Sequence, residues 1–291
     1  MPIVITAASG HLGRLAVEAL IARGVTGSEI VAAARSPERI ADLADSVRTA
    51  RIDYHEPATV RDALDDGDTF VLISGNDPER RSAQHAAVIE AAVDAGAGRI
   101  VYTSCLRADD SPLALAESHF ATEKVLRSAG TGFTILRNGW YTENYLQYLP
   151  EARDRGVLVA SVGEGRVAPA TRRDLAEAIA VVATTDGHEG RVYELNGDTD
   201  LTYHDIAAAF SAVLGREVVY RPVSSDEHRS ILSDAGLPEP VVEAIVGIDA
   251  GLRQGAMPRV GDDLTRLLGR PTTSFGDGIR AAIEGQTTNA Q

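Results

Sequence analysis

Residues 3–21 form a strand, a turn of small residues and a helix in sequence, and this order constrains the fold more than any other feature. Residues 3–6 are the run Ile-Val-Ile-Thr, which is typical of a buried strand. Small residues then dominate positions 7–13, and residues 15–21 place apolar side chains along one face of a predicted helix. A chain that opens in this way is expected to build a parallel sheet flanked by helices.

The turn has the size and position of a phosphate-binding loop. A helix N-terminus leaves backbone N–H groups unpaired and carries partial positive charge, and both favour the pyrophosphate of a dinucleotide. The spacing is that of Gly-x-x-Gly-x-x-Gly, with Gly10 and Gly13 present but Ala7 in place of the first glycine. If this position needs a positive φ, alanine costs about 1 kcal/mol. If φ is negative, the methyl group only crowds the ribose. The sequence leaves both cases open, and also an ordinary strand-to-helix turn.

The rest of the first half alternates apolar strands with helices. Further strands are predicted at residues 29–34, 47–52, 69–73, 99–103 and 133–136, with helices between them, one of them capped by Ser36. Strands this apolar suit a parallel sheet covered on both faces, so we predict an α/β, Rossmann-type doubly wound fold. We expect residues 1–146 to form an NAD(P)-binding domain to which 171–197 return. Residues 147–291 are expected to form a smaller substrate lobe over the carboxyl ends of the strands.

Composition limits the location and the partners of the protein. The chain has 291 residues, 44% of them hydrophobic, and a formal net charge of −14, which disfavours nucleic acid and anionic membranes as partners. No apolar run approaches the length of a membrane span. The single cysteine, Cys105, excludes an internal disulfide and fits the cytoplasm. The seven histidines lack metal-ligand spacing, so we predict no metal. Whether the chain forms a homodimer stays open.

Residues at the ends of the predicted strands are candidates for the remaining cofactor contacts. Arg35 follows the second strand, where NAD-binding proteins carry an acidic residue, and a guanidinium there can pair with a 2′-phosphate. We therefore expect NADP(H) to be preferred over NAD(H). The alternative is that Arg35 is a solvated arginine that contacts no cofactor. Asp53 could accept from the adenine amino group or could simply stabilise a turn. Ser74 and Gly75 are small enough to lie beside the adenine ribose.

The segment after the sixth strand concentrates amides and aromatic rings where a nicotinamide and a flat substrate would meet. Asn138 and Asn144 could hydrogen-bond a carboxamide, and Trp140 or Tyr141 could stack on a ring. The alternative is that the rings are core residues at a domain junction. Arg172, at the start of a later helix, either reaches the cofactor or is solvated.

The chain lacks the proton donor of ketone-reducing short-chain dehydrogenases. Those enzymes use Tyr-x-x-x-Lys, whereas this chain has Phe120 four residues before Lys124. Lys124 could still contact the nicotinamide ribose, or could be a surface residue. An acceptor that takes hydride without concerted protonation, such as a quinone, fits this absence. Cys105 has no base nearby in sequence and is interpreted as a small core or loop residue.

Several separated motifs together resemble the NmrA-like, atypical short-chain dehydrogenases, and among them the bacterial type-2 NAD(P)H:quinone oxidoreductases. The most specific are residues 102–104, 111–116 with His119 and 122–124, and 136–141 with 143–145. Residues 170–172, 187–190, 192–195 and 269–273 add to the resemblance, which covers nearly the whole chain. Ala7 departs from the family's first glycine, and Cys105 stands where the relative has an aliphatic residue.

The resemblance implies a two-domain, NADPH-preferring enzyme that transfers hydride to a quinone or a similar flat electrophile. Two alternatives are a reductase of another aromatic acceptor, such as a triphenylmethane dye, and an NADP-binding redox sensor without turnover. Tyr141 is the candidate for orienting the acceptor. Taken with the residue-based candidates, the cofactor contacts are Thr6, Ala7, Ala8, Ser9, Gly10, His11, Leu12, Arg35, Asp53, Ser74, Gly75, Asn76, Asn138, Gly139, Trp140, Tyr141, Glu143, Asn144 and Arg172.

Overall fold

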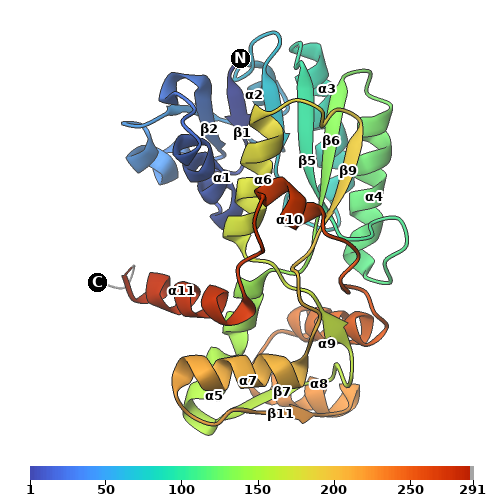
Figure 1. Cartoon of the computed structure of the whole chain (residues 1–291). Helices are drawn as coiled ribbons and strands as arrows, with labels where there is room; N and C mark the ends of the chain where they lie inside the picture. The colour runs from blue at the N-terminus through green and yellow to red at the C-terminus, as the bar shows by residue number, and fades with distance from the viewer. Residues whose placement is uncertain (289–291) are drawn as a thin grey trace.

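The computed structural model contains one parallel sheet of seven strands, and it describes residues 1–288 (Figure 1). Residues 289–291, the end of the predicted lobe, lie outside the described residues. The strand order is β3-β2-β1-β4-β5-β6-β9, and the predicted doubly wound α/β fold is confirmed. The strands are β1 (Ile3–Ile5), β2 (Ile30–Ala34), β3 (Arg48–Arg51), β4 (Thr69–Leu72), β5 (Arg99–Cys105), β6 (Gly132–Asn138) and β9 (Arg191–Leu195).

Helices cover both faces of this sheet, because alternate residues of each strand point to opposite sides. Ile3 and Ile5 pack in one core with α1 (His11–Ala22) and α6 (Arg172–Thr184). Val4 packs in the other core, beneath α2 (Ala58–Arg61), α3 (Arg81–Asp94) and α4 (Ala114–Arg127). Among residues 1–288, none of the helices combines the length and apolar character that crossing a bilayer requires.

A third core holds the second, lower half of the molecule together (Figure 1). Two small sheets pair β8 (Arg166–Val167) with β10 (Leu201–Thr202) and β7 (Val157–Ala160) with β11 (Val219–Pro222). Thr202 and Asp205 form a capping box at the start of α7. The helical segments of this half are η3 (Thr142–Tyr148), α5 (Leu149–Arg155), α7 (Tyr203–Leu214), α8 (Ser225–Asp234), α9 (Glu239–Arg253) and α11 (Phe275–Thr288).

The two halves are joined by several chain crossings that hydrogen-bond to one another. The amide of Gly139 donates to the carbonyl of Leu195 at 2.7 Å, and the amide of Ala170 donates to Trp140 at 3.0 Å. Farther along, the amide of Ala168 donates to Met257 at 3.1 Å. The backbone at the junction is therefore paired much as in a sheet, although the segments come from distant parts of the sequence.

Two local expectations differ from the structure. Residues 37–43 form a 3-10 helix, η2 (Pro37–Leu43), without a capping bond from Ser36. A second short 3-10 turn, η1 (Gly27–Glu29), precedes β2. Residues 263–268, placed in the predicted lobe, form α10 (Asp263–Leu268) and bury Leu264 in the core beside α1 and α6. The chain returns to the sheet half at α10 because apolar side chains such as Leu264 are buried there. These side chains are distant in sequence from the strands, so local sequence patterns do not reveal the return.

Candidate functional site

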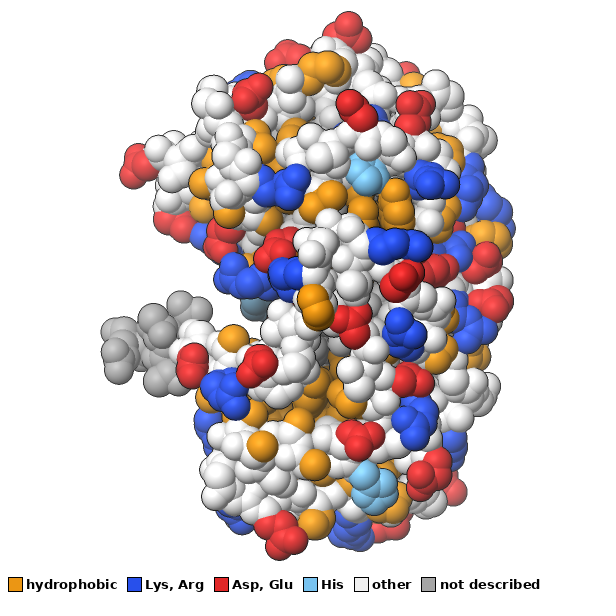
Figure 2. Space-filling model, in the orientation of Figure 1, with side chains coloured by type: hydrophobic (Ala, Val, Ile, Leu, Met, Phe, Trp, Pro, Cys, Tyr) orange, Lys and Arg blue, Asp and Glu red, His pale blue; other side chains and the backbone are white. Residues whose placement is uncertain are grey.

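A cavity of about 800 Å³ lies at the carboxyl ends of β1 to β4. The face seen in Figure 2 is hollowed between the sheet half and α11, and Lys or Arg side chains gather on the upper rim of that hollow. The cavity is lined by Ala7, Ser9, Gly10, His11, Leu12, Gly13, Arg35, Ser36, Arg39, Ile52, Asp53, Tyr54, His55, Ile73, Ser74, Gly75, Asn76, Asp77, Gln84, Tyr141 and Arg172. Most of the predicted cofactor contacts thus lie together around one space.

The N-terminus of α1 opens into this cavity. Gly10 is the N-cap residue and provides no side-chain capping bond. The amides of His11, Leu12 and Gly13 have no acceptor among the described residues. Unpaired amides at a helix start bind anionic oxygens, so this turn has the chemistry that a pyrophosphate needs.

Ala7 adopts the left-handed conformation, with φ of 51°. The turn needs this conformation because α1 passes very close to it. A Cβ on Gly13 would lie 2.3 Å from the Ala7 carbonyl oxygen. Of the two cases that the sequence left open, the structure has the strained one.

We expect Ala7→Gly to raise the free energy of unfolding. An L residue in the left-handed region costs about 1 to 2 kcal/mol, and the greater freedom of glycine in the unfolded chain offsets about 0.5 to 1 kcal/mol. The net gain is therefore roughly 0.5 to 1 kcal/mol, measurable by urea denaturation. Ala8→Gly is the matched control: Ala8 is buried and has no positive φ, so its loss should destabilise the protein. A lower stability for Ala7→Gly would contradict the strain argument.

One end of the cavity is cationic. Arg35, directly after β2, and Arg39, on η2, both line it and are both exposed. Neither side chain has a hydrogen bond or an ion pair within residues 1–288, although carboxylates outnumber cations in this chain. The sequence analysis predicted a cofactor contact from Arg35 but missed Arg39. The clue that could have identified Arg39 is its position on a short helix, four residues after Arg35.

The middle of the cavity is formed by the turns after β3 and β4. Asp53 lines it, but its carboxylate also accepts from the amide of His55 at 3.0 Å, so it stabilises the turn as well. Tyr54, which sequence reasoning missed, donates from its hydroxyl to the carbonyl of Ile73 at 2.6 Å and closes the floor. The loop of Ser74, Gly75 and Asn76 forms the opposite wall.

Tyr141 and Arg172 form the other end of the cavity. The guanidinium carbon of Arg172 lies 4.4 Å from the centre of the Tyr141 ring, a cation–π contact. Glu143 and Asn144 hold Arg172: the Glu143 carboxylate accepts from the Arg172 amide at 3.0 Å, and the Asn144 oxygen accepts from Nη2 at 2.9 Å. Burial raises the pKa of the Tyr141 hydroxyl, so it stays protonated and can donate a hydrogen bond.

Seven predicted cofactor contacts lie outside the cavity lining: Glu143 and Asn144, which hold Arg172, and five others, Thr6, Ala8, Gly139, Trp140 and Asn138. The Thr6 hydroxyl donates to the carbonyl of Val71 at 3.0 Å, and Ala8 is fully buried in the core. Gly139 lets the chain cross β9, since a Cβ there would lie 2.9 Å from the Leu195 carbonyl oxygen, and Trp140 packs into the core of the lower half. Asn138 is 4% exposed, and its amide has no hydrogen-bond partner among the described residues.

Lys124 also lies away from the cavity. It is exposed on α4, and its ammonium lies 4.6 Å from the centre of the Phe120 ring. Phe120 in turn packs against the small apolar cluster around Cys105. Burial, together with the negative charge of Glu123, raises the pKa of the Cys105 thiol to about 12. Cys105 is therefore a protonated buried residue, as its sequence context predicts.

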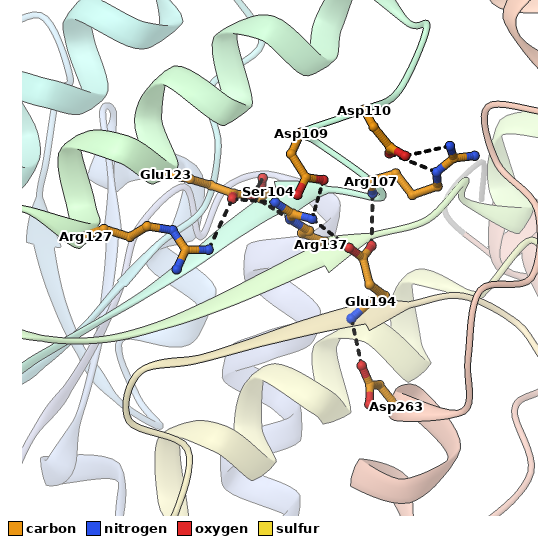
Figure 3. Close-up of polar contacts among 9 residues, drawn as sticks. All are labelled: Ser104, Arg107, Asp109, Asp110, Glu123, Arg127, Arg137, Glu194 and Asp263. Atoms are coloured by element: carbon orange, nitrogen blue, oxygen red, sulfur yellow. Dashed lines mark hydrogen bonds and ion pairs between the residues drawn. The ribbon is translucent and has the colours of Figure 1, made fainter.

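A buried ionic network centred on Arg137 joins β6 to α4 and β9 (Figure 3). Arg137, whose side chain is 6% exposed, makes two hydrogen bonds to the fully buried Glu123 at 2.9 and 2.8 Å. Its Nη1 also bonds Asp109 at 2.7 Å and Glu194 at 2.8 Å. Burial alone would lower the pKa of Arg137, but these carboxylates raise it. The network fixes the backbone just before the segment that carries Tyr141.

Within residues 1–288, no three His, Cys, Asp or Glu side chains gather in a way that could hold a metal ion. The absence of a metal stays a prediction. A dinucleotide, by contrast, fits the cavity: unpaired helix amides stand between a cationic end and an end with an aromatic ring and a guanidinium.

Comparison with known proteins gives the family. The model of the NAD(P)H-binding family matches residues 7–186. The chain belongs to that family. It is 40% identical to quinone oxidoreductase 2 of Escherichia coli K12 over 95% of this chain and 97% of that protein. The crystal structure of the NADPH-dependent E. coli quinone oxidoreductase with NADPH superposes with a TM-score of 0.92, 39% identity and coverage of 97% and 99%.

A second solved structure is nearly as similar. Triphenylmethane reductase of Citrobacter sp., complexed with NADP(H), gives a TM-score of 0.91 at 35% identity, covering 96% of this chain and 99% of that one. The resemblance to NmrA-like NAD(P)H-binding reductases is thereby confirmed.

Proposed function

We propose that this protein is a cytoplasmic NADPH-dependent oxidoreductase that transfers a hydride to a quinone or a similar flat electrophile. The observation that carries the proposal is the cavity, which runs from two unpaired arginines, past the uncapped start of α1, to Tyr141 and Arg172. A relative that is 40% identical over nearly the whole chain is a quinone oxidoreductase, which supports this acceptor class.

Each part of the cavity has a proposed role in binding NADPH. The amides at the start of α1 hold the pyrophosphate, and Arg35, with Arg39, pairs with the 2′-phosphate. Asp53 accepts from the adenine amino group. At the far end, Tyr141 and Arg172 contact the nicotinamide half of the cofactor.

Bound NADPH supplies the hydride, and the protein supplies position. Tyr141 lines the end of the cavity where the nicotinamide would lie, and its protonated hydroxyl can donate to an acceptor oxygen. Arg172 adds positive charge beside the Tyr141 ring, which favours an acceptor that gains negative charge. Glu143 and Asn144 keep Arg172 in place. Proximity and electrostatics are therefore the proposed sources of catalysis.

A simple assay tests the function. Purified protein is mixed with NADPH and 1,4-benzoquinone, and the loss of NADPH absorbance is followed. We expect consumption well above the uncatalysed rate. The similarity to triphenylmethane reductase favours a cationic triphenylmethane dye as a second acceptor, to be assayed in parallel. Tight NADPH binding without turnover of either acceptor would instead support a redox sensor.

Phe120→Tyr should not be required for quinone reduction. Phe120 packs against the cluster around Cys105 and does not line the cavity, so a hydroxyl there has no direct path to the acceptor. We expect kcat with benzoquinone to change by less than about threefold, since one positioned proton donor contributes about a hundredfold or more. An inert wild type that this substitution activates would overturn the proximity mechanism.

A further inference from the structure

Two residues of α3, one helical turn apart, hold both backbone polar groups of Gly75. Nε of Arg81 donates to the Gly75 carbonyl oxygen at 2.9 Å. The Gly75 amide donates to Nε2 of His85 at 3.1 Å. Residues four apart lie on the same face of a helix, so this face of α3 hydrogen-bonds both backbone polar groups of a single residue in the cavity wall.

A matching pair on α4 supports these two residues. Nη1 of Arg81 donates to the hydroxyl of Ser118 at 2.7 Å. Nδ1 of His85 lies 3.2 Å from the hydroxyl of Thr122, which itself donates to the carbonyl of Ser118 at 2.9 Å. Ser118 and Thr122 are also four residues apart, so two helical faces combine into one support behind Gly75.

The hydrogen bonds assign the tautomer of His85. Nε2 accepts from Gly75, so it carries no proton, and Nδ1–H donates to Thr122. Burial, and next the charge of Arg81, lowers the pKa of His85 to about 3. The ring is therefore neutral near pH 7 and remains an acceptor for the Gly75 amide.

Stability alone does not explain why a charged residue occupies this place. Arg81 is 8% exposed, and its side-chain hydrogen bonds go to a carbonyl and a hydroxyl. It has no carboxylate partner among residues 1–288. A buried cation without a counter-ion is costly, so a function that depends on its bond to Gly75 is indicated.

Holding Gly75 at both groups also orients its neighbours. In a trans peptide, the N–H and C=O point in opposite directions. Because the N–H and C=O of Gly75 face α3, the Ser74 carbonyl and the Asn76 amide face away from α3. Both residues line the cavity, and neither of these two backbone groups has a partner among the described residues. The loop thus presents one acceptor and one donor.

We propose that Arg81 and His85 are positioning residues that fix the Ser74 carbonyl and the Asn76 amide against the ribose hydroxyls of the bound dinucleotide. A hydroxyl both donates and accepts, so such a pair matches it. The inference rests on the proposed NADPH site. We call Arg81 and His85 together the Gly75 clamp. Because NADPH and NADH share the nicotinamide ribose and the position of the adenine ribose, the clamp serves both cofactors, whereas Arg35 serves NADPH alone.

The test compares cofactor affinities of clamp variants by calorimetry. His85→Leu and Arg81→Met should each raise Kd roughly five- to tenfold for NADPH and for NADH alike. At saturating NADPH, kcat and the KM for benzoquinone should stay within about twofold of wild type. His85→Gln keeps an acceptor oxygen and should recover part of the affinity. The double variant should lose less than the product of the two single losses, because both residues hold Gly75.

A matched control separates positioning from folding. His228 is another buried histidine, 2% exposed, located in the lower half. His228→Leu should lower Tm without changing cofactor affinity. If folded His85→Leu and Arg81→Met bind both cofactors as wild type does, or lose only Tm, the clamp proposal is overturned while the NADPH site stands. If wild type itself binds neither cofactor, both proposals fail.

Discussion

Replacing Arg35 by alanine is expected to weaken NADPH binding by roughly 10- to 100-fold and to leave NADH binding within about twofold of wild type. A guanidinium paired with a phosphate makes short, charge-assisted hydrogen bonds, whereas the ribose hydroxyl of NADH carries no charge to pair with. Arg35 has no competing carboxylate within the described residues, so its full charge is available to the cofactor.

Both dissociation constants are measured by calorimetry on cofactor-free protein. Arg39→Ala should shift the same ratio in the same direction by a smaller factor, since its guanidinium comes from the next helix rather than from the strand end. Arg173→Ala is the control, because Arg173 is exposed and does not line the cavity. Equal losses for NADPH and NADH in Arg35→Ala would remove the argument for specificity.

Arg137→Met is expected to lower the free energy of unfolding by about 3 to 5 kcal/mol, because it leaves Glu123 buried without its main counter-ion. Glu123 is fully buried, and the remaining cation near it is the half-exposed Arg127 at 3.7 Å. The double variant Arg137→Met, Glu123→Leu should be more stable than Arg137→Met alone, since no charge is then left buried.

Urea denaturation of the two variants measures this order. Arg61→Ala serves as the control, because its ion pair with Asp94 at 3.5 Å is exposed and should contribute little. If the double variant is less stable than Arg137→Met, Leu and Met do not pack in the space, and the network stabilises by more than charge compensation.

Local patterns predicted the sheet and most of the cavity. Each strand end of a parallel sheet is marked by an apolar run that stops, so residues such as Arg35 and Ser74 could be placed at one edge. Patterns did not reveal that Thr6 is used inside the sheet, and they left open whether Trp140 contacts the cofactor or packs in a core, as it does in the lower half. Those outcomes depend on which distant segment supplies a partner.

The strain at Ala7 illustrates the same limit. The spacing located the position and the alternatives, but φ is decided by how closely α1 approaches the turn, and only the fold shows this. The clamp on Gly75 was equally hidden. Its two i, i+4 pairs are visible in the sequence, yet nothing in the sequence says that these helices lie side by side.

The paired backbone where the two halves meet has a consequence for how the enzyme would accept different substrates. Rotating one half against the other would have to bend several crossing segments together, because bonds such as Gly139 to Leu195 and Ala170 to Trp140 tie these segments to one another. A junction of this kind is stiff and resists hinge motion of the two halves. Acceptors as different in size as a small quinone and a bulky dye would then be accommodated by rearranged side chains rather than by movement of a whole domain.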